Sequence, residues 1–268
     1  MLLGLDDGLW PRDADVVIVG LGPVGATAAL TLARAGLQVV IFEKDEGDGS
    51  GDLSESRAST FHPPTLEILD DLGVADDLHK VGLIAATYQY RDRTEGLVAE
   101  FDLAAIAGDT RFPYRLQSEQ QNLVRIIRDR LAGLPNAFVV QGAQVTGTRQ
   151  TGDIVEVLVE PAAAGDGRGG AAVGRARWVI AADGSHSVVR RGLGIDFPGM
   201  TYPEQFLVVS TTEDFAELIP GIAPVNYFSD PREWLVLLRT PLHWRVLFPI
   251  PENEAEGAAL EPAAVQRR

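Results

Sequence analysis

The sequence predicts an α/β protein in which a Rossmann-type nucleotide-binding domain is combined with an antiparallel sheet. Three observations support this fold class. Residues 15–43 have the pattern of a buried strand, a glycine turn, a helix and a second buried strand. An Asp-Gly pair at 183–184 directly follows another apolar strand. Short runs rich in aromatic and β-branched residues, separated by Pro and Gly, fill residues 197–250, which is typical of an antiparallel sheet.

The composition is that of a globular protein and excludes several kinds of chemistry. The 268 residues are 46% hydrophobic and 23% charged, with 23 basic and 38 acidic side chains, which gives a formal charge of −15. This charge argues against a nucleic-acid partner, because phosphates would be repelled. The absence of cysteine excludes disulfides and thiolate chemistry, and the four histidines have no metal-ligand spacing. We expect a cytoplasmic protein without a signal peptide or a membrane span.

The first strand and its turn carry the most informative motif. Residues 1–13 are expected to form a loose leader in which only Trp10 packs. The apolar run Val16–Val19 then stops at a GxGxxG motif whose glycines are Gly20, Gly22 and Gly25. In this context the glycines permit a tight turn, close approach of a pyrophosphate and close helix packing. The motif therefore predicts an adenine dinucleotide at a helix N-terminus.

The predicted helix extends from Val24 to about Ala35 and ends at Gly36, a residue suited to a left-handed cap. A second buried strand, residues 38–42, leads directly to Glu43. This carboxylate lies 18 positions after Gly25 (43 − 25), near the offset at which an acidic residue binds a ribose.

A loop dense in Asp, Gly and Ser follows at residues 44–56 and is expected to lie on the surface. Arg57 comes next and has two interpretations of equal weight. Its guanidinium is placed to reach a bound cofactor, and it is equally placed to pair on the surface with Glu55 or Asp52.

Two further helices are predicted before residue 132. Thr65 is expected to cap a helix that ends at Gly73, and Ser118 to cap a helix that ends at Leu131. Gln117 precedes the second of these helices, and its position alone favours a solvated loop amide over a ligand contact. Strands are expected at 88–93, 98–102, 138–140, 143–149, 154–160, 177–182, 206–210, 225–228, 233–238 and 244–248, a flexible tip at 161–174, and a tail without regular structure at 251–268.

The stretch ADGSHSVVR is the second informative site. A buried strand ends at Asp183-Gly184, and a short helix follows in which Ser187 and Arg190 lie three residues apart on one face. A carboxylate at the C-terminal end of a strand lies where open α/β sheets bind ligands, although Asp-Gly is also a common turn dipeptide.

Together the fingerprint, the stretch SRASTFHPPTLEIL and the stretch ADGSHSVVR closely resemble the flavin-dependent aromatic hydroxylases of the p-hydroxybenzoate hydroxylase fold. Within that group the run from Arg57 to Leu72 is most similar to 3-(3-hydroxyphenyl)propionate hydroxylases. The similarity spans nearly all of residues 15–250, and its most specific element is the DGxxSxxR motif.

The resemblance implies a discontinuous FAD-binding domain at 13–80 and 115–196, a substrate-binding sheet at 81–114 and 197–250, and a tail at 251–268. It raises Arg57 and Gln117 to expected cofactor contacts. It assigns FAD binding to Gly20, Gly22, Pro23, Val24, Gly25, Glu43, Lys44, Arg57, Gln117, Asp183, Gly184, Ser187 and Arg190.

The activity implied by the resemblance is hydroxylation of a phenolic or related aromatic substrate by an FAD-dependent monooxygenase. In that family NAD(P)H reduces FAD, O2 forms a flavin C4a-hydroperoxide, and one oxygen atom passes to the ring. No catalytic residue is assigned, since His243, Tyr227 and Arg245 on the predicted sheet favour structural roles. A homodimer or a separate C-terminal chain is a possible assembly.

The sequence departs from the family at its end. The glycine-aspartate motif that family members carry after the sheet is absent between Phe248 and Arg268, so we expect the chain to be an N-terminal portion of such a protein. Two alternatives stay open for this reason. One is a flavin-dependent halogenase or reductase on the same scaffold, and the other is a truncated, non-catalytic FAD-binding subunit.

Overall fold

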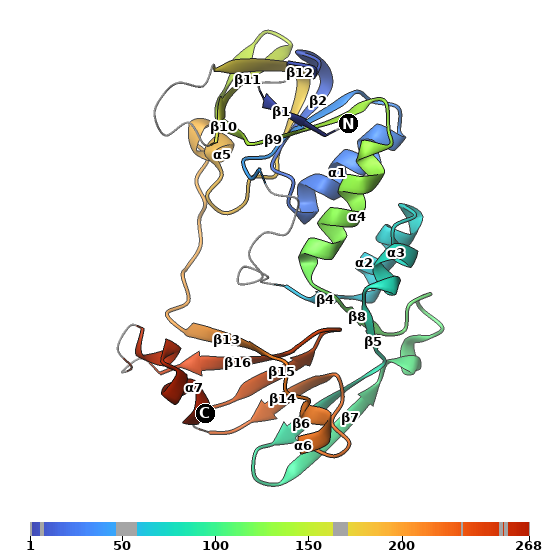
Figure 1. Ribbon diagram of the computed structural model, residues 1–268, viewed down its shortest axis with the longest axis vertical. Helices are drawn as coiled ribbons and strands as arrows, with labels where there is room; N and C mark the ends of the chain where they lie inside the picture. Colours follow the sequence, from blue (N-terminus) through green and yellow to red (C-terminus); the bar gives the residue numbers. More distant parts are fainter. Residues whose placement is uncertain are drawn as a thin grey trace. The chain divides into compact units, whose positions relative to one another are not determined.

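The chain forms two compact units, each made of two separate stretches (Figure 1). The computed structural model describes residues 2–5, 8–46, 58–162, 171–231, 233–251, 254 and 257–267. The first unit contains Met1–Arg57 and Gln120–Pro198, and the second contains Ala58–Glu119 and Gly199–Arg268. This grouping differs from the expected boundaries, because residues 58–80 and 115–119 associate with the second unit.

The first unit is built on a seven-stranded sheet with the order β1-β9-β3-β2-β12-β11-β10. The strands from β1 to β12 in this order are parallel, and β11 and β10 continue the sheet in antiparallel pairing. This confirms the predicted sequence of strand, turn, helix and strand at residues 15–43. The bounds are β1 (Leu2–Gly4), β2 (Asp13–Val19), β3 (Val39–Phe42), β9 (Ala137–Gln141), β10 (Ala143–Thr151), β11 (Ile154–Pro161) and β12 (Ala172–Ala181).

Helices α1 (Pro23–Arg34) and α4 (Gln120–Ala132) lie side by side and pack on the strands β3 and β9 (Figure 1). A hydrophobic core of the first unit includes Trp10, Phe42 and valines of β10 and β11. The rings of Trp10 and Phe42 meet edge to face with centroids 5.1 Å apart. Residues Val16–Val19 of β2 and all of β3 are buried almost completely, as is usual for the central strands of a parallel sheet.

The N-terminal leader contains more structure than the sequence predicted. Residues 2–4 form β1, which adds a parallel edge strand beside β9, with Leu3 opposite Val140. The prediction of a loose leader was therefore wrong for these residues, although Trp10 packs as expected. Parallel pairing with a strand so distant in sequence leaves no local pattern in a three-residue segment.

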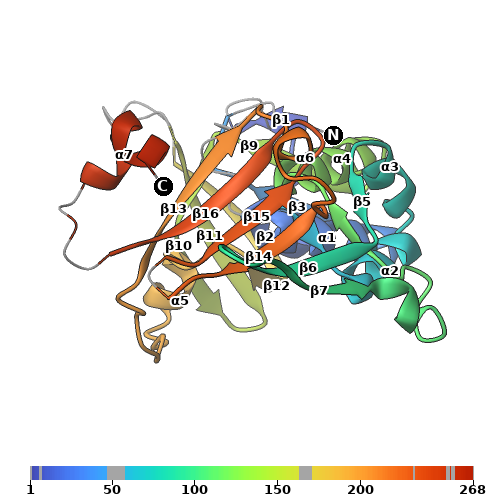
Figure 2. The ribbon, with the colours of Figure 1, turned by 90° about the horizontal axis from the view of Figure 1, so that it is seen from below.

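The second unit contains a six-stranded sheet with the order β13-β16-β15-β14-β6-β7, in which only β14 and β6 are parallel (Figure 2). A small sheet with the order β4-β8-β5 joins residues 58–119 into the same unit. The strands are β4 (Thr60–Phe61), β5 (Leu83–Ala85), β6 (Thr87–Asp92), β7 (Gly96–Asp102), β8 (Arg115–Gln117), β13 (Gln205–Thr211), β14 (Val225–Ser229), β15 (Leu235–Arg239) and β16 (Trp244–Ile250).

Short helices complete the two units, and three of their features differ from the predictions. Helix α2 begins at Pro63 after His62, so Thr65 is not its cap. Proline is favoured at the first helical position, which explains the earlier start. Helix α4 begins at Gln120 rather than at Ser118, and the predicted tail contains two helical segments, η4 and α7. The remaining bounds are α3 (Ala75–Lys80), η3 (Leu103–Ile106), α5 (Val188–Gly192), α6 (Phe215–Leu218), η4 (Ala258–Leu260) and α7 (Pro262–Arg267), while α2 ends at Asp71.

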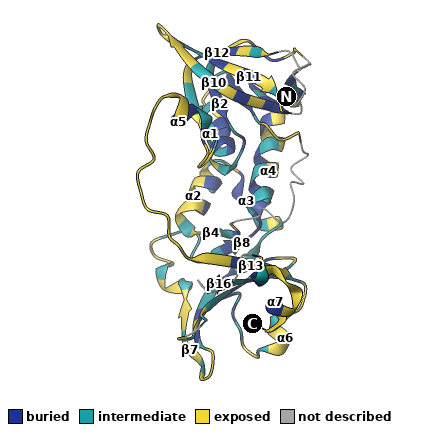
Figure 3. Cartoon of the chain, turned by 90° about the vertical axis from the view of Figure 1, so that its left-hand side faces the viewer, coloured by how far each residue is buried: buried dark blue, intermediate teal, exposed yellow. Residues whose placement is uncertain are grey.

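The segment from α5 to β13 is exposed along its length. Every residue from 191 to 206 is exposed, and this stretch appears as a continuous exposed trace in Figure 3. Among the helices that the structure describes, none combines the length and the apolar character needed to cross a bilayer.

Candidate functional site

The glycine turn after β2 is held in a shape that only glycine permits at two of its three motif positions. Gly20 has a φ of +94°, and a Cβ atom on it would lie 2.6 Å from the carbonyl oxygen of Ala182. A Cβ atom on Gly25 would lie 2.0 Å from the carbonyl oxygen of Gly20. The turn, the helix and the strand β12 therefore approach one another too closely for any side chain.

Gly22 has a different environment. It is the residue before α1, its backbone is extended, and nothing lies within 4 Å of where its Cβ atom would be. No side chain caps the N-terminus of α1, and Pro23 occupies its first turn. Open space thus lies directly in front of a helix N-terminus, where backbone N–H groups and the helix dipole favour an anion.

Glu43 links the end of β3 to the glycine turn. Its Oε2 atom accepts a hydrogen bond from the backbone N–H of Leu21 at 2.6 Å, and its Oε1 atom accepts one from the N–H of Asp45 at 3.1 Å. The carboxylate is therefore fixed beside the turn, and Lys44 follows it directly in the chain. This arrangement supports the predicted placement of an acidic group at the glycine motif.

The Asp183-Gly184 junction lies beside the same turn. The N–H of Ala182 donates to the carbonyl oxygen of Val19 at 2.9 Å, so the end of β12 is tied to the end of β2. The Oδ2 atom of Asp183 accepts hydrogen bonds from the N–H groups of Val188 and Val189 at 2.7 and 3.3 Å. Its Oδ1 atom is buried and has no hydrogen-bond partner among the described residues.

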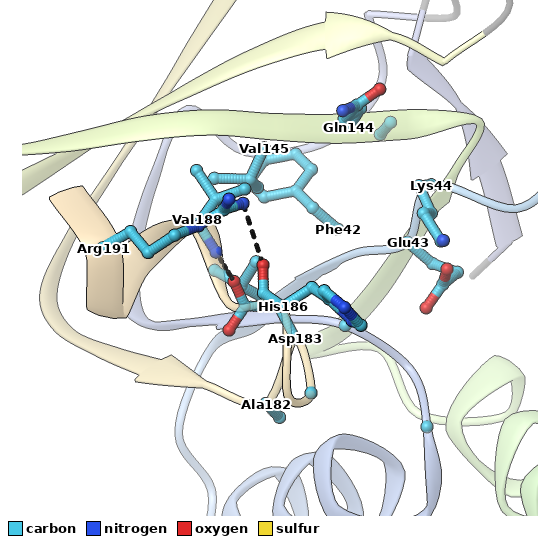
Figure 4. A pocket seen from close by; sticks show the side chains of 15 residues that line it. Phe42, Glu43, Lys44, Gln144, Val145, Ala182, Asp183, His186, Val188 and Arg191 are labelled. Carbon is cyan, nitrogen blue, oxygen red and sulfur yellow. Dashed lines mark hydrogen bonds between the residues drawn. The ribbon is translucent and has the colours of Figure 1, made fainter. Parts of the chain in front are cut away.

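Both turns open into one cavity of about 410 Å³ (Figure 4). It is bounded by the C-terminal ends of β2, β3 and β12 and by the start of β10. The sequence-predicted residues among its lining are Gly20, Gly22, Glu43, Lys44, Asp183 and Gly184. A ligand site at the carboxyl ends of neighbouring parallel strands is the arrangement expected of a doubly wound sheet.

The other predicted residues of the first unit do not line this cavity. Pro23, Val24 and Gly25 belong to the first turn of α1. Ser187 caps α5, because its Oγ atom accepts a hydrogen bond from the N–H of Arg190 at 3.0 Å. The Arg190 guanidinium lies over the ring of Phe197, 4.8 Å from the ring centroid. Contacts of these residues with a cofactor stay predictions.

The two remaining predicted residues lie elsewhere. Gln117 belongs to the second unit, on β8, where it is fully buried and accepts a hydrogen bond from Thr60 at 2.8 Å. The interpretation of Gln117 as a solvated loop amide was therefore wrong. Arg57 lies outside the described residues, as does most of the loop at 44–56.

Sequence reasoning missed three polar side chains of the cavity, His186, Arg191 and Gln144. Arg191 donates from Nη2 to the carbonyl oxygen of His186 at 3.0 Å (Figure 4). It also donates from Nε to the carbonyl oxygen of Ser187 at 3.2 Å. The adjacent arginines of the motif indicated that a positive charge would lie near this site. The orientation of α5 places Arg191, and not Arg190, in the lining of the cavity. Gln144 was missed because the start of β10 carries no motif.

The cavity fits a dinucleotide chemically. The open turn at Gly22 and the N-terminus of α1 suit a diphosphate, and Lys44 and Arg191 add positive charge. Glu43 and the unpartnered Oδ1 atom of Asp183 are acceptors for hydroxyl groups of a sugar. A buried acceptor without a partner is costly, so a hydroxyl donor at this position would be favourable.

Comparison with known proteins finds an FAD-binding family model and relatives that are named as monooxygenases or hydroxylases. Residues 13–246 match the family model described as FAD binding domain. The chain is 34% identical over 257 residues to a para-nitrophenol 4-monooxygenase of Pseudomonas sp. strain WBC-3, covering 94% of this chain and 59% of that protein. It is 31% identical over 209 residues to a 3-(3-hydroxy-phenyl)propionate/3-hydroxycinnamic acid hydroxylase of Paraburkholderia xenovorans LB400, covering 75% of this chain and 30% of that protein.

A solved structure shows the same fold at similar identity. The crystal structure of a p-nitrophenol 4-monooxygenase from Pseudomonas putida DLL-E4 matches with a TM-score of 0.83 and 32% identity, covering 96% of this chain and 62% of that chain. The chain thus spans about three fifths of the length of these nitrophenol monooxygenases.

Proposed function

This chain belongs to the FAD binding domain family, and from that premise we propose that it forms the FAD-binding part of a monooxygenase that hydroxylates a phenolic compound. The observation that carries the proposal is the cavity at the ends of β2, β3 and β12, where an open glycine turn, a helix N-terminus and two carboxylates converge. Because the chain spans only part of its relatives' length, FAD binding is proposed for the chain and hydroxylation for the protein in which it works.

The residues have distinct roles in this proposal. The turn at Gly20 and Gly22 and the first backbone N–H groups of α1 hold the diphosphate, and Glu43 accepts hydrogen bonds from the ribose. Asp183 orients a hydroxyl of the cofactor through its Oδ1 atom while its Oδ2 atom holds α5 in place. When bound, FAD supplies the redox and oxygen-activating chemistry, and the protein supplies binding, orientation and exclusion of water.

The proposed substrates follow from the relatives rather than from the cavity. The named relatives act on a nitrophenol and on hydroxyphenyl acids, which supports a phenolic substrate, with O2 and NAD(P)H as co-substrates. The second unit contains tyrosine rings that can pack against an aromatic compound and an arginine that can bind its polar group. Tyr88, Tyr90 and Tyr227 lie near one another on one sheet, and Arg115 donates to the Tyr227 hydroxyl at 3.1 Å.

The first test is a titration of the purified chain with FAD, followed by quenching of flavin fluorescence. We expect saturable binding that ADP displaces, because ADP carries the diphosphate and ribose that the cavity would hold. Absence of FAD binding would refute the proposal.

The second test measures NAD(P)H oxidation by the full-length gene product with a panel of phenols, and identifies products by mass spectrometry. A hydroxylated product is expected. A chloride-dependent halogenated product would instead indicate a flavin-dependent halogenase. FAD binding without any substrate-stimulated oxidation would indicate a non-catalytic FAD-binding subunit.

A further inference from the structure

The second unit contains a cavity of its own, with a volume of about 540 Å³. It is formed by the start of α2, the start of β6, the segment at η3 and the start of β8. Its apolar part is made by Pro63, Pro64, Leu103 and Ile106, and the ring of Tyr88 also lines it. This lining suits the flat apolar surface of an aromatic ring.

Arg115 gives the cavity a positive charge in a fixed position. Its guanidinium lies over the Tyr88 ring, 4.4 Å from the centroid, and its Nη1 atom donates to the Tyr227 hydroxyl at 3.1 Å. Among the described residues, no carboxylate forms an ion pair with Arg115. A guanidinium has five N–H donors in a planar fork, so several are left to bind a carboxylate or phenolate.

The lining also contains two carboxylates, Glu67 and Asp109, and among the described residues neither forms an ion pair with Arg115. The Oε1 atom of Glu67 accepts hydrogen bonds from the Thr110 hydroxyl at 2.7 Å and from the N–H of Arg111 at 3.3 Å. Asp109 is exposed. Burial, and secondly the charge of Arg115, lowers the pKa of His62 below its usual 6.5, which keeps this imidazole neutral at neutral pH.

We propose that this cavity binds an aromatic anion, with the ring against Tyr88 and the prolines and with the carboxylate or phenolate oxygen on Arg115. The two carboxylates of the lining, Glu67 and Asp109, accept a donor substituent such as a hydroxyl or amino group on the same ring. The inference rests on the proposed function for the aromatic class of the ligand, and it adds the anionic group and the residue that selects it.

The test compares two probes that differ only in charge. Binding of 4-aminobenzoate and of its neutral amide is measured by calorimetry at neutral pH without FAD. In the unmodified chain the anion should bind at least about tenfold more tightly than the amide. Arg115→Gln should remove this preference, and Arg115→Lys should retain part of it because the charge remains. Arg111→Gln is the matched control, since Arg111 pairs with Asp70 on the surface and does not line the cavity.

A cavity-filling variant tests whether both probes bind in this cavity, without changing its charge. Ile106→Trp should weaken both probes by the same factor and leave their ratio unchanged. The proposal is overturned if the unmodified chain shows no preference for the anion, if neither probe binds, or if Arg115→Gln retains the preference. If the Arg115 variants do not fold, the probe ratio of the unmodified chain and the Ile106→Trp result decide the question. An FAD titration of the same preparations separates failure of this site from failure of the proposed function.

Discussion

The glycine turn supports a prediction in which the same substitution at two glycines affects two different properties, FAD affinity at Gly22 and folding stability at Gly25. At Gly22 the backbone has φ −64° and ψ 179°, which any L-residue adopts, and no atom lies within 4 Å of a new Cβ atom. Gly22→Ala should therefore change the free energy of unfolding by no more than about 0.5 kcal/mol. At Gly25 the new Cβ atom would lie 2.0 Å from the carbonyl oxygen of Gly20, so the turn and the helix must separate.

Overpacking of this kind costs about 1–3 kcal/mol. At roughly 2–4 °C for each kcal/mol, Gly25→Ala should lower the melting temperature by about 2–12 °C. Gly22→Ala should lower the affinity for FAD, because the methyl group of the new alanine would occupy the space proposed for the diphosphate. Loss of one hydrogen bond to a charged group, about 1.5–3 kcal/mol, corresponds to roughly a 10- to 150-fold rise in Kd.

Circular dichroism melts and flavin fluorescence titrations measure the two effects separately. Gly108→Ala is the control, because Gly108 lies in the second unit and has open space around its Cβ position. An unchanged FAD affinity in Gly22→Ala would refute the placement of the diphosphate. An unchanged melting temperature in Gly25→Ala would refute the packing argument.

Three further predictions concern single side chains. Asp183→Ala removes the acceptor for two N–H groups at the start of α5 and should lower the free energy of unfolding by about 1 kcal/mol in urea titrations; an unchanged midpoint would contradict this. Arg115→Gln should raise the pKa of His62 toward 6.5, measured by NMR titration of the imidazole, and an unchanged titration curve would show that the guanidinium charge does not act on it. Hydrogen bonding to Arg149 lowers the pKa of Glu156 below its usual 4.5, so this pair stabilises the folded state above that pH, and the stability is lost as the pH falls through the lowered pKa. Arg149→Gln should therefore weaken the pH dependence of urea unfolding below pH 4.5, and identical profiles would exclude a contribution from the pair.

The sequence predicted the elements whose signals are local. The glycine motif, the helix that ends before Gly36 and the alternating strands after residue 204 each carry their pattern within a dozen residues, and the structure confirms them. The cap of α2 was predicted three residues late, at Thr65 instead of His62, because the helix-starting preference of Pro63 competes with the capping preference of Thr65.

Features that depend on distant partners could not be predicted in the same way. Gln117 has the sequence neighbourhood of a surface loop, and its place on the central strand β8, between Thr60 of β4 and Leu83 of β5, explains its burial. The choice of Arg191 over Arg190 as a cavity residue depends on how α5 is anchored by Asp183, which a motif does not specify. The position of the Arg115 guanidinium in the second cavity is held by a hydrogen bond to Tyr227, more than a hundred residues later in the chain.

The pairing of β2 with β12 affects how the protein is made. Val16 lies opposite Trp178, about 160 residues later, while β3 must also wait for β9. At about 5–20 residues per second, roughly 10–30 seconds of translation separate the emergence of β2 from that of its neighbour. During that interval the apolar edge of a nascent strand is unpaired, which makes the growing polypeptide a natural client for chaperones that bind extended hydrophobic segments.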